Sequence, residues 1–529
     1  MSDMRSDWNK LQSNFWSSLL VLLVSFYAVS WARDKIKVSY RAENLEGVEK
    51  GDESYKKLID NVVFIHEGVT IKADSAQYYD QKGIIEAYGH IEIIDKDGAS
   101  IVADRLLYDT NKKVAQLRDQ VVYQADTITC YTDQLDYEVN TKKGYFSQGG
   151  RLVEGDNTLS SESGYYDDAD KSAVFYHQVE LVNQDYTLQC DTLRYNTATK
   201  IAQFEGPTKI TTKDGETLTT EEGGEYNTSN KDSTFKRSKV ETAGYILAGN
   251  LLRANQTEDY YAATGQVQLI AKEHKTTITG DYGQYWKEKS MAQVYGNPLM
   301  QHIINEDTLY LTADTLLALE EKLTNGSIDV VVLAYNNVKI YKSDLQGKAD
   351  SMAYHSLDST IYFYNQPIFW SYDNQITAET IRIVLHDQKL DKMYIDHNAF
   401  LAAEDTLGNF NQLKGRDMVA YFKDNKITSI DIEGNGESLY FAINNSLQLV
   451  GMNYLKCSHM RIDMDQEKLA KISFFMQPVG LFYPPHKIAT DGKELADFTW
   501  RIAERPTLQE ILARGYGQHK QYKAFKFNK

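Results

Sequence analysis

Hydrophobic and polar residues alternate along most of the chain, and this alternation predicts β-strands. In the segments 179–183 and 186–190, apolar or small residues occupy every second position and most residues between them are polar. A period of two with one apolar face is typical of strands that bury one side only. Long helical periodicity is missing until residues 505–513, where Thr507 with Glu510 three residues later predicts a short capped helix.

A motif of about 29 residues repeats along the chain. It places an acidic residue three positions after an apolar one and a tyrosine four positions later, as in Ile71 to Tyr78, Ile101 to Tyr108 and Leu188 to Tyr195. The acidic positions 74, 104, 133, 162 and 191 are 29 or 30 residues apart, and later spacings lengthen towards 40, which indicates loop insertions. One such unit cannot bury its own apolar face, so the units must stack. The sequence predicts an all-β, elongated solenoid or folded-over sheet of about 12–13 units.

Each unit has a second signature, a Gly or Asn between two short apolar runs. Examples are the segments 87–93, 263–269, 294–300 and 364–369. Gly and Asn adopt positive φ at little steric cost, so we expect a turn at each of these positions.

The first 32 residues read as an export signal. A polar start carries Arg5 and Lys10, an apolar run begins at Phe15, and Ser30 and Ala32 provide the small residues of a cleavage site after Ala32. The run is shorter than the ~20 residues of a comfortable membrane span, although an uncleaved N-terminal anchor is the alternative. The predicted organisation is a signal or anchor at 1–32, repeated β-structure at 33–480, and a C-terminal extension with a short helix and a basic tail at 481–529.

Composition narrows the class of protein further. The 529 residues carry a net charge of −17, which argues against nucleic acid as the main partner. Three cysteines are too few for disulfide bonds to hold a chain of this length together, so a disulfide scaffold is excluded. The 37 tyrosines outnumber the 19 phenylalanines, in keeping with a strand-rich protein.

At this point the residues resemble a known family. The repeated motif, followed by Ala-x-Gly-x-Val or Gly-Asn-Pro, is similar to the OstA/LptA-like proteins of lipopolysaccharide transport. The many repeats and the ending from Gln477 through Arg505-Pro506 look like the long OstA-like proteins of the Bacteroidetes type. The resemblance spans roughly Lys37 to Ile511. It implies a β-jellyroll, or β-taco, whose two sheets open along one edge, binding of lipid A acyl chains in an apolar trough, and a place in the periplasm, in association with the inner or outer membrane.

The apolar residue before each acidic position should face the interior. Two interpretations stay open: these residues fill a closed core, or part of the row stays open as a trough for acyl chains, each CH₂ of which contributes ~0.8 kcal/mol on burial. The candidate lipid-binding residues are Ile71, Ile101, Ile128, Leu159, Leu188, Ile278, Leu311, Ile376, Leu413 and Leu455.

The other conspicuous residues favour structural roles. Repeated acids in a β-solenoid can ligate Ca²⁺, but the Gly- and Asp-dense loops of such sites are missing, so a turn or cap role is expected. Cys130, Cys190 and Cys457 occupy small-residue positions, and we expect them to be small buried fillers. The tail holds Lys520, Lys523, Lys526 and Lys529 without an acid, which fits a solvated tail or a contact with anionic lipid headgroups or an acidic partner.

No motif of assembled catalysis is found in the sequence. The eleven histidines form no metal-binding spacing, and neither a phosphate loop nor a Gly-x-Ser-x-Gly elbow is present. We therefore expect no enzyme, no metal and no cofactor. The leading hypothesis is a lipopolysaccharide carrier that docks other envelope proteins by edge-strand pairing. The alternatives are a structural or adhesive solenoid without cargo and a β-helical polysaccharide-degrading enzyme.

Overall fold

A computed structural model describes residues 38–515, apart from short gaps at 52, 96–97, 126, 168, 256, 259, 273–274, 287, 305–306, 325, 388, 425, 466–467 and 489–491. The predicted signal at 1–32 and the basic tail beyond Gly515 lie outside the described residues. Strands make up 72% of the structure and helices 3%, which confirms the all-β class. Among the described residues, no helix is long and apolar enough to cross a membrane.

The chain divides into two compact units, the first ending at Ala173 and the second beginning at Val174. The division falls inside strand β13 (Ser172–Val182). The strands of unit 1 that precede it are β1 (Ser39–Arg41), β2 (Asn44–Lys50), β3 (Glu53–His66), β4 (Val69–Tyr79), β5 (Ile84–Ile94), β6 (Ser100–Asp109), β7 (Val114–Ala125), β8 (Ile128–Glu138), β9 (Lys143–Phe146), β10 (Gly150–Glu154), β11 (Asn157–Ser161) and β12 (Ser163–Asp167).

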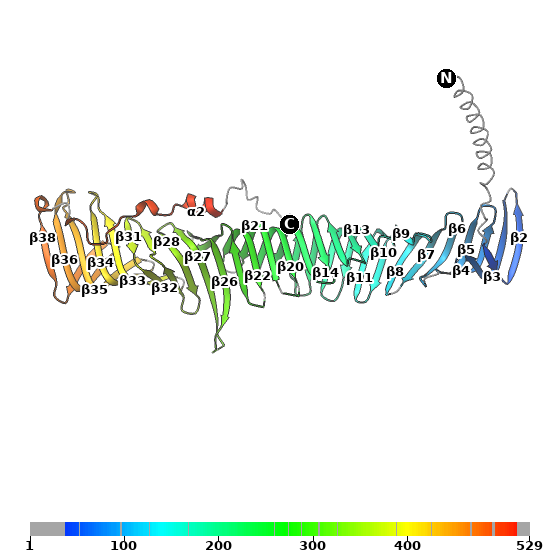
Figure 1. Cartoon of the computed structure of the whole chain (residues 1–529), viewed down its shortest axis with the longest axis horizontal. Helices are drawn as coiled ribbons and strands as arrows, with labels where there is room; N and C mark the ends of the chain where they lie inside the picture. The colour runs from blue at the N-terminus through cyan, green and yellow to red at the C-terminus, as the bar shows by residue number, and fades with distance from the viewer. Residues whose placement is uncertain are drawn as a thin grey trace, which may run out of the picture. The chain divides into compact units, whose positions relative to one another are not determined.

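Unit 2 continues the same antiparallel pairing of strands that follow one another in the chain (Figure 1). Its strands are β14 (Tyr186–Asn196), β15 (Ile201–Glu205), β16 (Thr208–Thr212), β17 (Thr217–Thr220), β18 (Gly223–Asn227), β19 (Asp232–Glu241), β20 (Tyr245–Asn255), β21 (Tyr260–Ala271), β22 (Thr276–Trp286), β23 (Met291–Tyr295), β24 (Leu299–Ile304), β25 (Asp307–Thr312), β26 (Thr315–Lys322), β27 (Ile328–Lys342), β28 (Leu345–His355), β29 (Thr360–Tyr364), β30 (Ile368–Ser371), β31 (Asn374–Thr377), β32 (Thr380–His386), β33 (Lys389–Glu404), β34 (Phe410–Lys423), β35 (Lys426–Ile443), β36 (Leu449–Asp465), β37 (Lys468–Phe475) and β38 (Val479–Tyr483).

The expected Gly and Asn turns are in several copies bulges inside one long strand. Gly89 has a φ of 74° and His90 a φ of 41°, and the pairing of β5 with β6 shifts register at this point. Two successive residues of positive φ add one residue to the strand and bend it. At Gly296 and Asn297, by contrast, the chain does turn, because β23 ends and β24 begins. We call each such bulge or turn a corner. Each copy of the repeat therefore contributes residues on both sides of a corner.

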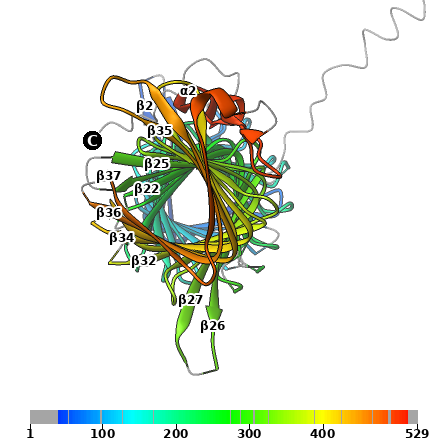
Figure 2. The ribbon, with the colours of Figure 1, turned by 90° about the vertical axis from the view of Figure 1, so that its left-hand side faces the viewer.

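The strands of unit 2 curve round a common interior, which the end-on view in Figure 2 shows. Phe363 and Phe369 lie in its largest apolar cluster with their ring centroids 4.9 Å apart, so residues on the two sides of the corner meet across the interior. In unit 1 a separate cluster contains Phe64, Ile71 and Ile101. The predicted inward direction of the apolar strand faces is thus observed in both units.

The C-terminal segment carries the few helical turns. These are η1 (Pro485–Lys487), η3 (Ile502–Glu504) and α2 (Leu508–Gly515). The backbone N–H of Glu510 donates to Thr507 Oγ1 at 3.1 Å, which confirms the predicted capped helix.

Candidate functional site

The candidate apolar residues fall on rows of directly opposed residues that run from strand to strand. We call the row through these residues the ladder row. In unit 1 it consists of Phe64, Ile71, Ile93, Ile101, Tyr123, Cys130, Leu152 and Leu159. In unit 2 it consists of Leu188, Ile210, Leu218, Val240, Leu247, Leu269, Ile278, Met300, Leu311, Ile340, Gly347, Phe369, Ile376, Leu401, Leu413, Ser438, Leu455 and Gly480.

Nine of the ten candidate residues lie on the ladder row of their own unit. The exception is Ile128, which lies two residues along β8 from Cys130, the residue that occupies the row there. Four of the ten are half-buried, namely Ile128, Ile278, Leu413 and Leu455. The other six are buried, namely Ile71, Ile101, Leu159, Leu188, Leu311 and Ile376.

Burial changes sharply along the ladder row of unit 2. Seven consecutive members, here called the open segment, are all aliphatic and all half-buried. Five consecutive members that follow, here called the closed segment, are all buried. The open segment is Ile210, Leu218, Val240, Leu247, Leu269, Ile278 and Met300, and the closed segment is Leu311, Ile340, Gly347, Phe369 and Ile376.

The residues across the interior explain part of this change. In the closed segment, Met352, Phe363 and Ile381 form the facing row and fill the space opposite the ladder. On the strands of the open segment the facing row mixes large and small residues, namely Gly224, Phe235, Leu252, Ala263, Gly283 and Val294. A Cβ at position 224 would lie 2.2 Å from the carbonyl oxygen of Thr234, so only glycine fits there. The small residues Gly224, Ala263 and Gly283 leave part of the space opposite the open segment unfilled.

The acidic positions lie at the corners, but they accept mainly from side chains and not from the backbone N–H groups expected of a turn or cap role. Asp74 Oδ2 lies 2.7 Å from His90 Nδ1, and this carboxylate raises the pKa of His90. A Cβ at position 89 would lie 2.4 Å from the same carboxylate oxygen, which explains the glycine. The side-chain amides of Asn297, Asn337, Asn365 and Asn398 donate in the same way to Asp281, Asp314, Asp350 and Glu379. The acids thus bind mainly corner side chains, and the backbone N–H of His397 donates to Asp417.

The three cysteines are free thiols, and the expected burial holds for two of them. Cys190 and Cys457 are buried and Cys130 is half-buried. Burial raises the pKa of Cys130 to about 11 and that of Cys190 to about 12. Thiols with raised pKa values are poor nucleophiles at neutral pH, in keeping with a filling role.

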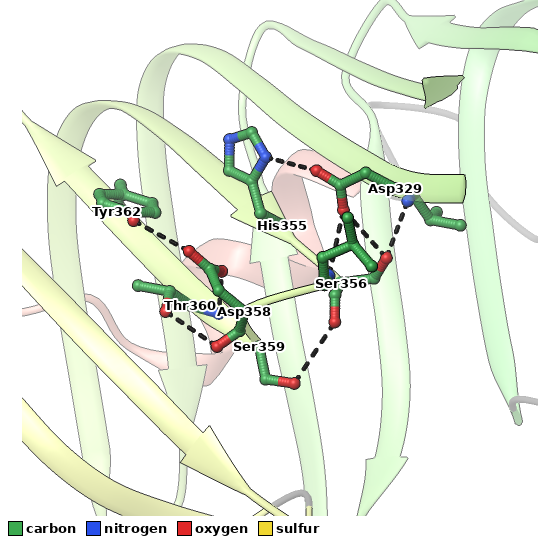
Figure 3. A network of polar contacts seen from close by, with 9 residues as sticks. Asp329, His355, Ser356, Asp358, Ser359, Thr360 and Tyr362 are labelled. Atoms are coloured by element: carbon green, nitrogen blue, oxygen red, sulfur yellow. Dashed lines mark hydrogen bonds and ion pairs between the residues drawn. The ribbon is translucent and has the colours of Figure 1, made fainter. Parts of the chain in front are cut away.

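One polar network contains an Asp, a His and a Ser, the residue types of a hydrolase triad, but its hydrogen bonds are not those of a triad (Figure 3). His355 Nδ1 lies 2.8 Å from Asp329 Oδ2, but the Ser356 hydroxyl donates to Asp329 at 3.1 Å and not to the histidine. The backbone N–H of Val330 donates to Ser356 Oγ at 2.8 Å. The network therefore ties the start of β27 to the end of β28. The hairpin β26–β27 projects from unit 2 in Figures 1 and 2.

No group of three or more His, Cys, Asp or Glu side chains within the described ranges is placed to hold a metal ion. A shallow apolar hollow lies on α2, lined by Leu508, Gln509, Leu512 and Ala513. It belongs to one helix on the outer side of the sheet, so the open segment is the stronger candidate for an apolar ligand.

A comparison with known protein families agrees with the resemblance seen in the sequence. Residues 33–191 match the family model described as OstA-like protein. A comparison with curated proteins finds no match. One similar solved structure is LptH of Pseudomonas aeruginosa, described as the LptA homologous periplasmic component of the lipopolysaccharide transport device. It is 14% identical, covers 26% of this chain and 81% of its own, and gives a TM-score of 0.14. Residues 33–191 are therefore an OstA-like region, and the family resemblance is confirmed there.

Proposed function

We propose that this protein is a periplasmic carrier of lipopolysaccharide that holds lipid A acyl chains along the open segment on their way to the outer membrane. The observation that carries the proposal is the run of seven half-buried aliphatic residues in one cross-strand row. Its six inter-strand steps of about 4.8 Å give an apolar track about 29 Å long. Each CH₂ group buried against such a track contributes about 0.8 kcal/mol.

Charge supports contact with acyl chains more than with headgroups. The chain has a net charge of −17, and lipid A carries phosphates, so the protein as a whole repels the headgroup. A carrier of this charge gains affinity from the apolar part of the ligand. The OstA-like match of residues 33–191 supports the same function class.

Strand edges at the C-terminal end of unit 2 supply a surface for the predicted protein partners. Within the described strands, β37 and β38 each pair with β36 alone. Val479 is 63% exposed and Phe482 58% exposed on β38. Bare edges with exposed apolar residues favour strand addition, and we propose that another envelope protein of the transport system pairs here.

The test of the carrier function is a pair of matched double variants. Leu247→Asp with Leu269→Asp places two carboxylates on cross-strand partners of the open segment. Ile246→Asp with Ile270→Asp places two on the adjacent partner pair, which is also half-buried but points to the opposite face. We expect the first variant to lose photo-crosslinking to lipopolysaccharide, the second to retain it, and both to keep the β circular-dichroism spectrum.

Two outcomes would contradict the proposal. Equal crosslinking of both variants would mean that the lipid lies elsewhere. If the unmodified protein failed to bind lipopolysaccharide at all, the solenoid without cargo would be the better description, in keeping with the buried ladder residues Ile71 and Ile101 of unit 1.

A further inference from the structure

The C-terminal residues 484–488 and 492–515, here called the strap, run back along the outer side of unit 2. In Figure 1 the strap leaves the last strands and passes over β31 and β28 to α2. At one end Leu495, Phe498 and Trp500 pack against the apolar cluster that includes Phe441 of β35. At the other end α2 contacts β24, β25 and β27.

Two buried glutamines hold the strap backbone. Gln412 donates from Nε2 to the carbonyl of Lys493 at 3.0 Å and accepts from the N–H of Leu495 at 2.7 Å. Gln375 repeats this pattern with the carbonyl of Thr499 and the N–H of Arg501, both at 2.7 Å. Each glutamine thus satisfies a donor and an acceptor two residues apart in the strap. Both side chains are nearly inaccessible to solvent.

A third glutamine and several ion pairs extend this attachment towards α2. Gln346 Oε1 accepts from Arg505 Nε at 2.7 Å. The Arg505 guanidinium also donates to the carbonyl of Tyr372 at 2.9 Å. Four ion pairs join strap and sheet, namely Lys414–Asp497, Lys348–Glu504, Lys339–Glu510 and Arg514–Asp314.

The attachment points follow the ladder row on the opposite face of the sheet. Gln346, Gln375 and Gln412 directly precede ladder residues Gly347, Ile376 and Leu413. Successive residues of a strand point to opposite faces, so the strap lies behind the ladder. The strap residues 499–515 cover β31 to β25, the strands of the closed segment. The last of them, in α2, contact β24, where the open segment ends.

We propose that the strap braces the closed segment from outside and so confines lipid to the open segment. The inference rests on the proposed carrier function. Lipid could enter the closed segment only if its strands moved apart from the facing residues, and Phe369 already touches Phe363 there. Movement of these strands would break the paired hydrogen bonds of Gln375 and leave buried polar groups without partners, which is unfavourable.

The experiment places a diazirine side chain at position 247 in the open segment or at 369 in the closed segment and measures crosslinking to purified lipid A. The strap is released by Gln346→Ala with Gln375→Ala. The matched control is Thr187→Ala with Thr277→Ala, which precede ladder residues Leu188 and Ile278 in strands outside the contacts described for the strap. Hydrogen exchange at the Arg501 amide reports whether the strap has detached, and a chain ending at Phe498 removes its second half outright.

We expect crosslinking at 247 and little at 369 in the unmodified protein. Release of the strap should raise crosslinking at 369 about tenfold, equivalent to about 1.4 kcal/mol, with little change at 247 and no change in the threonine control. Equal crosslinking at 369 and 247 in the unmodified protein, or none at 369 after the strap has detached, would overturn the brace. Absence of crosslinking at 247 in the protein with an intact strap would instead contradict the carrier function on which the brace rests.

Discussion

The open and closed segments of unit 2 share one row, antiparallel pairing and one repeat motif, yet differ in burial. Leu247 and Leu269 are half-buried, whereas Phe369 and Ile376 are buried. Two differences accompany this. The facing row is the run Met352, Phe363 and Ile381 on strands of the closed segment but is interrupted by Gly224, Ala263 and Gly283 on strands of the open one, and the strap lies behind the closed segment. A repeat motif therefore sets where a residue lies in the sheet, while the residues on either side of the sheet set whether it is accessible.

The largest expected effect is a difference in stability between an alanine variant of the closed segment and one of the open segment. Phe369→Ala should lower the free energy of unfolding by about 3–5 kcal/mol, because it leaves a cavity in a filled core. Leu247→Ala should lower it by only about 1 kcal/mol, the ordinary size for a substitution at a partly exposed position. Guanidinium unfolding, monitored by hydrogen exchange in unit 2, measures the loss of unfolding free energy in each variant. Equal losses would show that the open segment is as well packed as the closed one.

A smaller effect concerns the strap. Gln412→Ala leaves the Lys493 carbonyl and the Leu495 N–H without their buried partner, so strap attachment should weaken by about 1–3 kcal/mol. Thr187→Ala, at the equivalent position before Leu188, should change stability by no more than about 0.5 kcal/mol. Exchange of the Leu495 amide provides the measurement. Unchanged exchange in the glutamine variant would mean that the apolar contacts alone hold the strap.

The smallest expected effect is a pH dependence of the strap. Hydrogen bonds from Arg501 and then Lys348 lower the pKa of Glu504 from 4.5 to about 2. A carboxyl group whose pKa is lowered by folding stabilises the folded state fully above its unfolded pKa, and this stabilisation is lost as pH falls through the folded value. Strap attachment should therefore weaken between pH 4.5 and about 2.

Limited proteolysis of the strap across this pH range, with Glu504→Gln as the control, tests the assignment. The variant lacks the titrating group, so its proteolysis should change less with pH than that of the unmodified protein. A parallel pH response of both proteins would assign the titration to other groups.

Much of the strand structure was accessible from local pattern. Period-two alternation predicts strands because one face is buried, and the spacing from Ile71 to Tyr78 predicts which residues share a row. The corner role of Asp74 followed from the absence of Gly- and Asp-dense loops. The bulge at Gly89 and His90 was expected as a turn, since positive φ is common to both.

The strap glutamines were missed, although the sequence contains a signal for them. The residue before the ladder position is Thr70, Ser100, Thr158, Thr187 and Thr277 in earlier copies. In later ones it is Tyr310, Gln346, Gln375, Gln412 and Tyr454. A longer amide in place of a small hydroxyl, on the face away from the core, indicates a polar partner on that side.

The sequence by itself determined the all-β class and the capped helix at Thr507, because strand alternation and helix capping depend on neighbours within a few residues. The repeat spacing of 29 or 30 residues determined the recurring ladder and corner positions. Only the tertiary structure decided which ladder residues are buried and what the C-terminal segment does. Burial depends also on residues far away in sequence, such as Leu495 against Gln412 and Thr499 against Gln375. Local pattern carries no information on such distant partners, since the same apolar residue satisfies an open trough and a filled core equally well.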